Sequence, residues 1–211
     1  MGKIEKRVYS ISKNDSEEKG DNYIINRISP NRYLVALCDG MGSGKEAHEI
    51  SSCVTDLLSD MLTAGFSEES TYKIINSFVI ANLSGFGFTT MDFMVIDLKQ
   101  MTAKIIKKGA CPTYIKRNSN EIFSVENKSL PAGLLWQKPY TKTVNIMKDD
   151  IIVMMSDGAI EALNDKNWIK NILLKNPTSN LNESIDLIFS IAQKDGDMKE
   201  DDITVLGIKI A

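Results

Sequence analysis

The stretch RYLVALCDGMGSGK, residues 32–45, decides the fold because its structural period changes within a few residues. Residues 32–39 form an apolar run of strand length that ends at an aspartate. Glycines at positions 40, 42 and 44 then interrupt the run. From Lys45 to about Thr63 the pattern is helical, and one face of this helix carries Ala47, Ile50, Val54, Leu57, Leu58 and Met61. The stretch therefore predicts a buried strand, a tight glycine turn and an amphipathic helix.

Upstream of this stretch, the sequence predicts a β-hairpin. Residues 21–28 form a second strand-like run, and Ser29-Pro30-Asn31 separates it from residues 32–39 as a turn signal. Residues 13–20 are a polar loop, and residues 8–12 are a candidate first strand. The segment 1–19 is the least certain part of the chain, an N-terminal extension with that first strand.

Downstream, Ser67 is a favourable N-cap for a second helix that runs to about Leu83 and is followed by a glycine-rich loop at 84–88. Helices return between residues 157 and 194. Strand-like runs occupy residues 91–98, 102–107, 113–116, 121–125, 141–146, 151–155 and 203–210. This order lacks the regular βαβ alternation of a doubly wound fold, so we expect an α+β protein with antiparallel sheets covered by helices. We expect one domain over residues 1–211.

Composition excludes several classes of function. The chain has 211 residues, a formal charge of −3 and no basic cluster, so no nucleic-acid partner is expected. No apolar run is long enough to cross a bilayer. The three cysteines have no metal-ligand spacing, which favours free thiols in a reducing cytoplasm.

Aspartates stand where strand patterns give way to loops. Asp21 opens one strand, Asp39 and Asp157 end apolar strands and are each followed by glycine, and Asp201-Asp202 precedes the last strand. Carboxylates gathered in one place repel each other, and divalent cations neutralise them. Oxygen ligands suit Mg²⁺ or Mn²⁺. The alternative is that each aspartate only forms a turn, because Asp-Gly is a common turn signal.

The glycines at 40–44 also invite comparison with a nucleotide-binding P-loop. That motif needs glycine where Asp39 stands and serine or threonine where Glu46 stands. Both ends fail, so an NTPase is rejected.

Together, these motifs resemble the PPM family of metal-dependent protein phosphatases, and within it the sporulation stage II protein E branch. The matching segments are Gly20-Asp21-Asn22, Cys38-Asp39-Gly40-Met41-Gly42-Ser43-Gly44, Met155-Ser156-Asp157-Gly158 and Asp201-Asp202-Ile203-Thr204-Val205. The resemblance covers residues 20–210 and implies a four-layer α-β-β-α sandwich, in which two antiparallel sheets are flanked by helices.

The resemblance also implies two Mn²⁺ or Mg²⁺ ions and a set of ligands. Asp39 would bridge the ions and act in catalysis with Asp157. The implied ligands are Asp21, Asp39, the Gly40 carbonyl, Asp157, Asp201 and Asp202. Asp202 stands where many relatives have asparagine, so the resemblance implies that Asp201 is the ligand and Asp202 supports it, with the exchanged assignment as the alternative. Met41 replaces the histidine that eukaryotic relatives carry as a candidate general acid, and no substrate-binding residue is assigned.

The function that the resemblance implies is removal of phosphate from a serine of an anti-sigma-factor antagonist in sporulation signalling. The alternatives are a phosphatase of a stress-response partner switch and a catalytically weak interaction domain of the same fold. The phosphorylated antagonist is the expected partner, and the resemblance allows a homodimer through the helices at 45–83. It further implies a cytoplasmic domain whose full-length parent is anchored in a membrane through an upstream segment.

Overall fold

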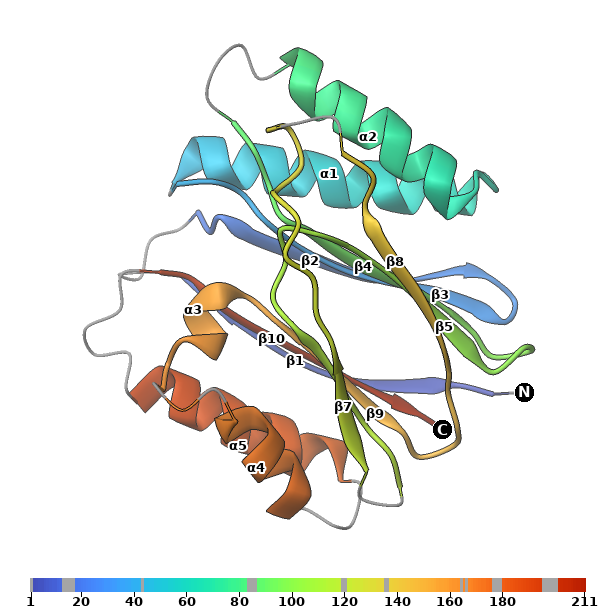
Figure 1. Ribbon diagram of the computed structural model, residues 1–211, viewed down its shortest axis with the longest axis vertical. Coiled ribbons are helices and arrows are strands. Elements are labelled where there is room, and N and C mark those ends of the chain that lie inside the picture. The colour runs from blue at the N-terminus through green and yellow to red at the C-terminus, as the bar shows by residue number, and fades with distance from the viewer. Residues whose placement is uncertain are drawn as a thin grey trace. The chain divides into compact units, whose positions relative to one another are not determined.

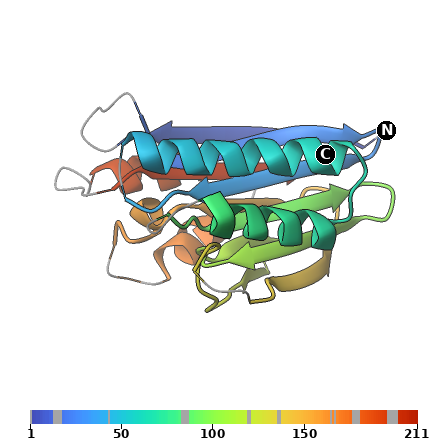
Figure 2. The same cartoon turned by 90° about the horizontal axis from the view of Figure 1, so that it is seen from above.

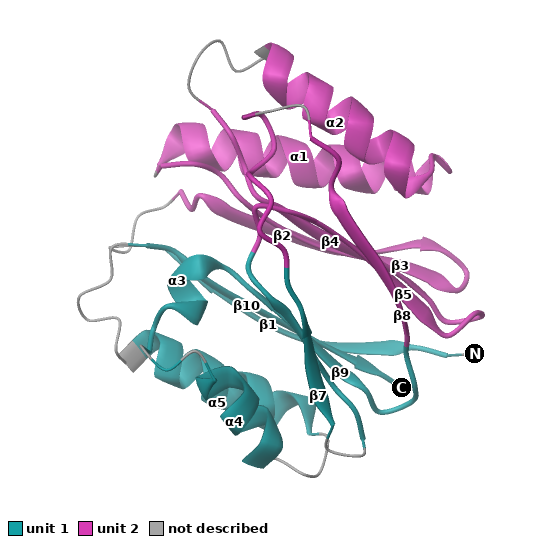
Figure 3. Ribbon diagram, viewed as in Figure 1, with its two compact units in different colours: residues 1–16, 111–126, 146–211 teal, residues 17–110, 127–145 magenta. Residues whose placement is uncertain are grey.

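A computed structural model describes residues 2–12, 18–42, 44–82, 87–118, 121–134, 137–163, 165, 167–175, 180–194 and 201–211 of the chain. These residues form two compact units (Figure 3). Unit 1 contains residues 1–16, 111–126 and 146–211, and unit 2 contains residues 17–110 and 127–145. Among the helices in the described ranges, none combines the length and the apolar character needed to cross a bilayer.

Unit 2 is an antiparallel sheet with two helices against it. Within the described residues its strand order is β2-β3-β4-β5-β8. The strands are β2 (Asp21–Ser29), β3 (Arg32–Asp39), β4 (Met91–Asp97), β5 (Thr102–Lys108) and β8 (Tyr140–Asn145). Helices α1 (Lys45–Thr63) and α2 (Glu68–Asn82) lie alongside each other, and α1 packs on β2 and β3 (Figures 1 and 2).

The core of unit 2 lies between these helices and one face of the sheet. Leu34, Ala36 and Cys38 of β3 pack with Val54 and Leu58 of α1 in this core. Because side chains alternate along a strand, residues 35, 37 and 39 point to the opposite face. Asp39 is therefore on the sheet face that α1 does not cover.

Unit 1 has the same plan. The strand order among its described residues is β1-β10-β9-β6-β7, and every pair is antiparallel. The strands are β1 (Ile4–Ile11), β6 (Thr113–Lys116), β7 (Ile122–Val125), β9 (Ile151–Met155) and β10 (Ile203–Ile210), and the helices are α3 (Asp157–Ile160), α4 (Trp168–Lys175) and α5 (Leu181–Lys194). Apolar side chains of α4 and α5 pack with those of β9 and β10, as Ile169, Ile185, Val153 and Val205 show.

The predicted α+β class is confirmed, because each unit has an antiparallel sheet with helices packed on it. The predicted N-cap is also confirmed, since the Ser67 hydroxyl accepts a hydrogen bond of 3.1 Å from the Ser70 N–H. The prediction of a single domain over 1–211 stays a prediction. The predicted loops at 13–20 and 84–88, together with Ser43 and the predicted helix end at Leu83, lie wholly or partly outside the described residues.

The first strand is longer than predicted. It begins at Ile4 rather than Val8 and pairs with β10 from Ile4↔Ile210 to Ile11↔Ile203. The polar residues 5–7 hide its beginning from a pattern-based prediction. The backbone hydrogen bonds of this strand come from its pairing with β10, which the local sequence pattern does not predict.

Candidate metal centre

Asp21 and Asp39 face each other across the β2–β3 ladder. The register pairs Asp21 directly with Asp39, and Asp21 is buried. The backbone of Asp39 is held from the other side, because its N–H donates to Thr90 Oγ1 at 3.0 Å and its carbonyl accepts the Thr90 N–H at 2.8 Å. The Thr89 hydroxyl donates to the same carbonyl at 2.8 Å. Two predicted ligands therefore lie side by side on β2 and β3. The end of β3 is held in place by Thr89 and Thr90, which directly precede β4.

Gly40 sits where the chain leaves β3 and approaches the first turn of α1. Its N–H donates to the Gly20 carbonyl at 3.1 Å. A Cβ at this position would lie 2.1 Å from the Ala47 carbonyl oxygen, which is far inside van der Waals contact. Only glycine fits here, so the position of its carbonyl is coupled to the beginning of α1.

Unit 1 brings the other predicted ligands together at the ends of β9 and β10. Ser156 follows the last residue of β9, Asp157 then opens α3, and Asp201 and Asp202 precede β10. A Cβ on Gly158 would lie 2.2 Å from the Asp202 carbonyl oxygen and 3.2 Å from the Asp201 Cβ. The Ser156 hydroxyl ties the two strand ends together, since it donates to the Asp202 carbonyl at 3.3 Å and accepts the Thr204 N–H at 2.9 Å. Asp202 is buried and Asp201 is exposed.

Within each unit, the predicted ligands lie where negative charge is concentrated. Burial raises the pKa of Asp157, and the charges of Glu161 and Asp202 raise it further although the Gly158 N–H opposes them. In unit 2, burial raises the pKa of the Cys38 thiol, and the charges of Asp92, Asp39 and Asp21 add to that effect. Crowded carboxylates of this kind are a favourable environment for a divalent cation.

Glu161, Asp92 and Lys107 are charged residues near these sets to which the sequence assigned no role. Glu161 follows Asp157 by one helical turn, a spacing that could have revealed it. Asp92 was visible as a charge inside the otherwise apolar run of residues 91–96. Within the described part of the chain, no group of three or more histidine, cysteine, aspartate or glutamate side chains is placed so that it could hold a metal ion.

Comparison with known proteins identifies the family. The family model for stage II sporulation protein E (SpoIIE) matches residues 29–211. The chain belongs to the SpoIIE family.

Two curated SpoIIE proteins resemble the chain over 198 residues. The SpoIIE of Priestia megaterium is 32% identical, and the match covers 90% of this chain and 34% of that protein. The SpoIIE of Bacillus subtilis (strain 168) is 31% identical, with 90% of this chain and 24% of that protein covered. The chain thus spans about a third or less of these relatives.

Solved structures place the likeness in the phosphatase part of such proteins. A structure of the PP2C phosphatase domain and a regulatory-domain fragment of B. subtilis SpoIIE superposes with a TM-score of 0.89 at 27% identity, over 99% of this chain and 63% of that one. RsbX in complex with magnesium gives 0.79 at 21% identity, with both chains fully covered. The predicted fold and the predicted class, a PPM-type protein phosphatase domain, are confirmed.

His48 has a structural contact in this SpoIIE-family chain. Its Nδ1 lies 3.0 Å from the Lys19 carbonyl oxygen, so an N–H at this position donates to the loop before β2. Met41, at the position of the missing histidine, is 45% exposed.

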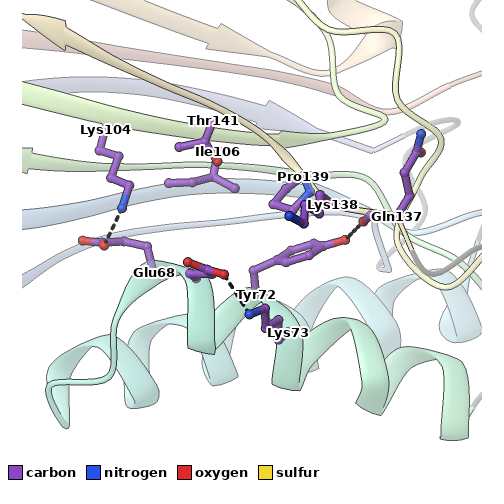
Figure 4. Close-up of a pocket in the computed structure, with 10 residues that line it drawn as sticks. Glu68, Tyr72, Lys73, Lys104, Ile106, Gln137, Lys138, Pro139 and Thr141 are labelled. Atoms are coloured by element: carbon purple, nitrogen blue, oxygen red, sulfur yellow. Dashed lines mark hydrogen bonds and ion pairs between the residues drawn. The ribbon is translucent and has the colours of Figure 1, made fainter.

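A pocket of about 340 Å³ lies elsewhere in unit 2, between α2, β5 and the segment before β8 (Figure 4). The Tyr72 hydroxyl donates to the Gln137 carbonyl at 2.5 Å, and Lys104 Nζ donates to Glu68 at 3.1 Å. No predicted metal ligand lines this pocket. The position of this pocket therefore does not coincide with the predicted metal ligands, which are the carboxylates near the strand ends.

Proposed function

We propose that this chain is a metal-dependent protein phosphatase that removes phosphate from a serine of an anti-sigma-factor antagonist protein. Its activity would need two Mn²⁺ or Mg²⁺ ions. The proposed ligands are Asp21, Asp39, the Gly40 carbonyl, Asp157 and Asp201, with Asp202 as the alternative to Asp201.

One observation carries the proposal. In each unit, an aspartate at or just after the end of a core strand is followed by a glycine that packs closely against backbone. Gly40 packs against Ala47, and Gly158 packs against Asp202. This packing fixes both carboxylates on the backbone of rigid elements, as a metal site requires. The donors are all oxygen atoms, which suits Mg²⁺ and Mn²⁺. The neighbour RsbX, which was solved with magnesium, supports this choice.

When bound, divalent cations would activate a water molecule and neutralise charge on the transferred phosphoryl group. The chain's own residues would hold and orient that centre. Asp39 would hold a cation from a fixed backbone, because Thr90 binds its N–H and both Thr89 and Thr90 bind its carbonyl. No nucleophilic side chain would be required, because the activated water would itself attack phosphorus.

The substrate is proposed from the family. Sporulation proteins share this domain, which favours an antagonist of the sporulation type over one of a stress-response partner switch. The deciding experiment assays phosphate release from a panel of purified phosphoserine antagonists of both types, with Mn²⁺ and with D39A as the inactive control. Selective release from the sporulation-type antagonist supports the proposal. An absence of turnover on every phosphoprotein would favour the interaction-domain alternative.

A homodimer through the helices at 45–83 is proposed on a separate observation. Ile74 and Ile80 of α2 are 46% and 44% exposed, and Phe66 before α2 is 50% exposed. A second copy covering these side chains would remove them from water. Sedimentation equilibrium tests this, and a monomer at all concentrations would contradict it.

The cytoplasmic location and the membrane anchor of a longer parent stay predictions.

A further inference from the structure

Asp92 and Lys107 form a buried ion pair in unit 2. Lys107 Nζ lies 2.5 Å from Asp92 Oδ2, and the side chains of Lys107 and Asp92 are 0% and 2% exposed, respectively. They are direct cross-strand partners on β4 and β5. Burying two charges costs several kcal/mol per ion, so such a pair contributes little net stability. Its presence in the middle of a sheet calls for another explanation.

The pair is on the same sheet face as Asp21 and Asp39. Asp92 is paired with Leu37 across β3–β4, and Asp39 is two residues beyond Leu37. Residues two apart on a strand share a face, so Asp92 is the diagonal neighbour of Asp39, roughly 7–8 Å away. The order across the sheet is therefore Asp21, Asp39, Asp92 and Lys107, three carboxylates followed by one ammonium group.

We propose that the Asp92–Lys107 pair sets the net charge beside the Asp21–Asp39 ligands and thereby tunes their affinity for a divalent cation. This inference rests on the proposed function. Asp92 is a positioning residue that holds the Lys107 ammonium group in place. Lys107 in turn neutralises Asp92 and keeps it from adding to the negative charge around Asp39.

Opposite substitutions should therefore shift metal affinity in opposite directions. In D92N the Lys107 ammonium group loses the opposing charge of Asp92 and repels the cation, and in K107M the Asp92 carboxylate loses the opposing charge of Lys107 and attracts it. A unit charge at roughly 8 Å, at an effective dielectric constant near 20, changes the affinity for a divalent cation by about tenfold or more. A purely structural role predicts instead that both variants lose stability and lose affinity together.

The experiment is isothermal titration of the full chain with Mn²⁺, alongside thermal melting. We expect D92N to bind Mn²⁺ at least about tenfold more weakly and K107M at least about tenfold more tightly. D92N/K107M, which removes both charges, should return to within about threefold of wild type. K104M is the matched control, because Lys104 is on the same strand, faces the other way and pairs with Glu68 at 3.1 Å. Its affinity should stay at the wild-type value.

A second variant covers the case in which a single substitution fails to fold. The reversed pair D92K/K107D keeps an ion pair but moves the ammonium group next to Asp39, so Mn²⁺ affinity should fall by about tenfold. The inference is overturned if D92K/K107D binds Mn²⁺ as tightly as the wild-type chain, or if D92N and K107M change the affinity in the same direction. In either case, Mn²⁺ binding by the wild-type chain would still support the metal site. A wild-type chain that binds no Mn²⁺ overturns the proposed function itself.

Discussion

Replacing Gly40 by alanine tests whether the approach of α1 to the end of β3 controls the metal centre. The added Cβ would lie 2.1 Å from the Ala47 carbonyl oxygen, where ordinary contact begins near 3.4 Å, so α1 or β3 must move by about 1.3 Å. Overpacking of this kind costs about 1–3 kcal/mol. At roughly 2–4 °C per kcal/mol for a chain of this size, the melting temperature should fall by about 2–12 °C. The same movement displaces the Gly40 carbonyl, so Mn²⁺ affinity should fall as well.

The control is Gly65→Ala in the turn between α1 and α2. Gly65 has φ +91°, and a methyl group added there would have no atom within 4 Å, so alanine costs backbone strain of about 1–2 kcal/mol without a clash. Both variants are melted without metal and titrated with Mn²⁺ by calorimetry. G65A should lose stability and keep its affinity, whereas G40A should lose both. A G40A protein with wild-type stability and affinity would refute the reasoning.

Chelation by EDTA should abolish phosphate release and Mn²⁺ should restore it, because the proposed donors are all oxygen atoms; turnover that survives exhaustive chelation contradicts this. Asp39→Ala and Asp157→Ala should each lower kcat by more than about tenfold, equivalent to about 1.4 kcal/mol, while the melting temperature of the metal-free protein holds or rises because repulsion is relieved. Retention of more than a tenth of wild-type kcat would remove that residue from the ligand set. Burial works to raise the pKa of Glu68, but its own backbone N–H, Lys104 and Arg32 outweigh burial and lower it. A carboxylate with a lowered folded-state pKa stabilises the fold above its ordinary pKa, and that stability is lost as pH falls through the folded-state value. Thermal melts of E68Q from neutral to acid pH should therefore show a shallower loss of stability below the ordinary pKa of Glu68 than wild type, and parallel curves would count against the pairing.

The sequence alone was sufficient for features that depend on local pattern. Strands β9 and β10 were predicted with the residue bounds that the structure shows, because each is a short apolar run with clear breaks on both sides. The face of α1 was predicted from its helical period, and Val54 and Leu58 are fully buried in the core of unit 2. The Asp-Gly pairs at 39–40 and 157–158 marked the strand ends for the same reason.

Only the tertiary structure decided which of these residues meet. The pairing of Asp21 with Asp39 and of Asp92 with Lys107 depends on strand register. A shift of one residue would move every side chain of the shifted strand to the other face of the sheet. Composition does not specify register, because the hydrogen bonds that set it join residues far apart in the chain. The same is true of β1, whose polar beginning becomes a strand only because β10 lies beside it. The sequence thus determined the candidate chemistry, and long-range backbone pairing determined which charges face one another.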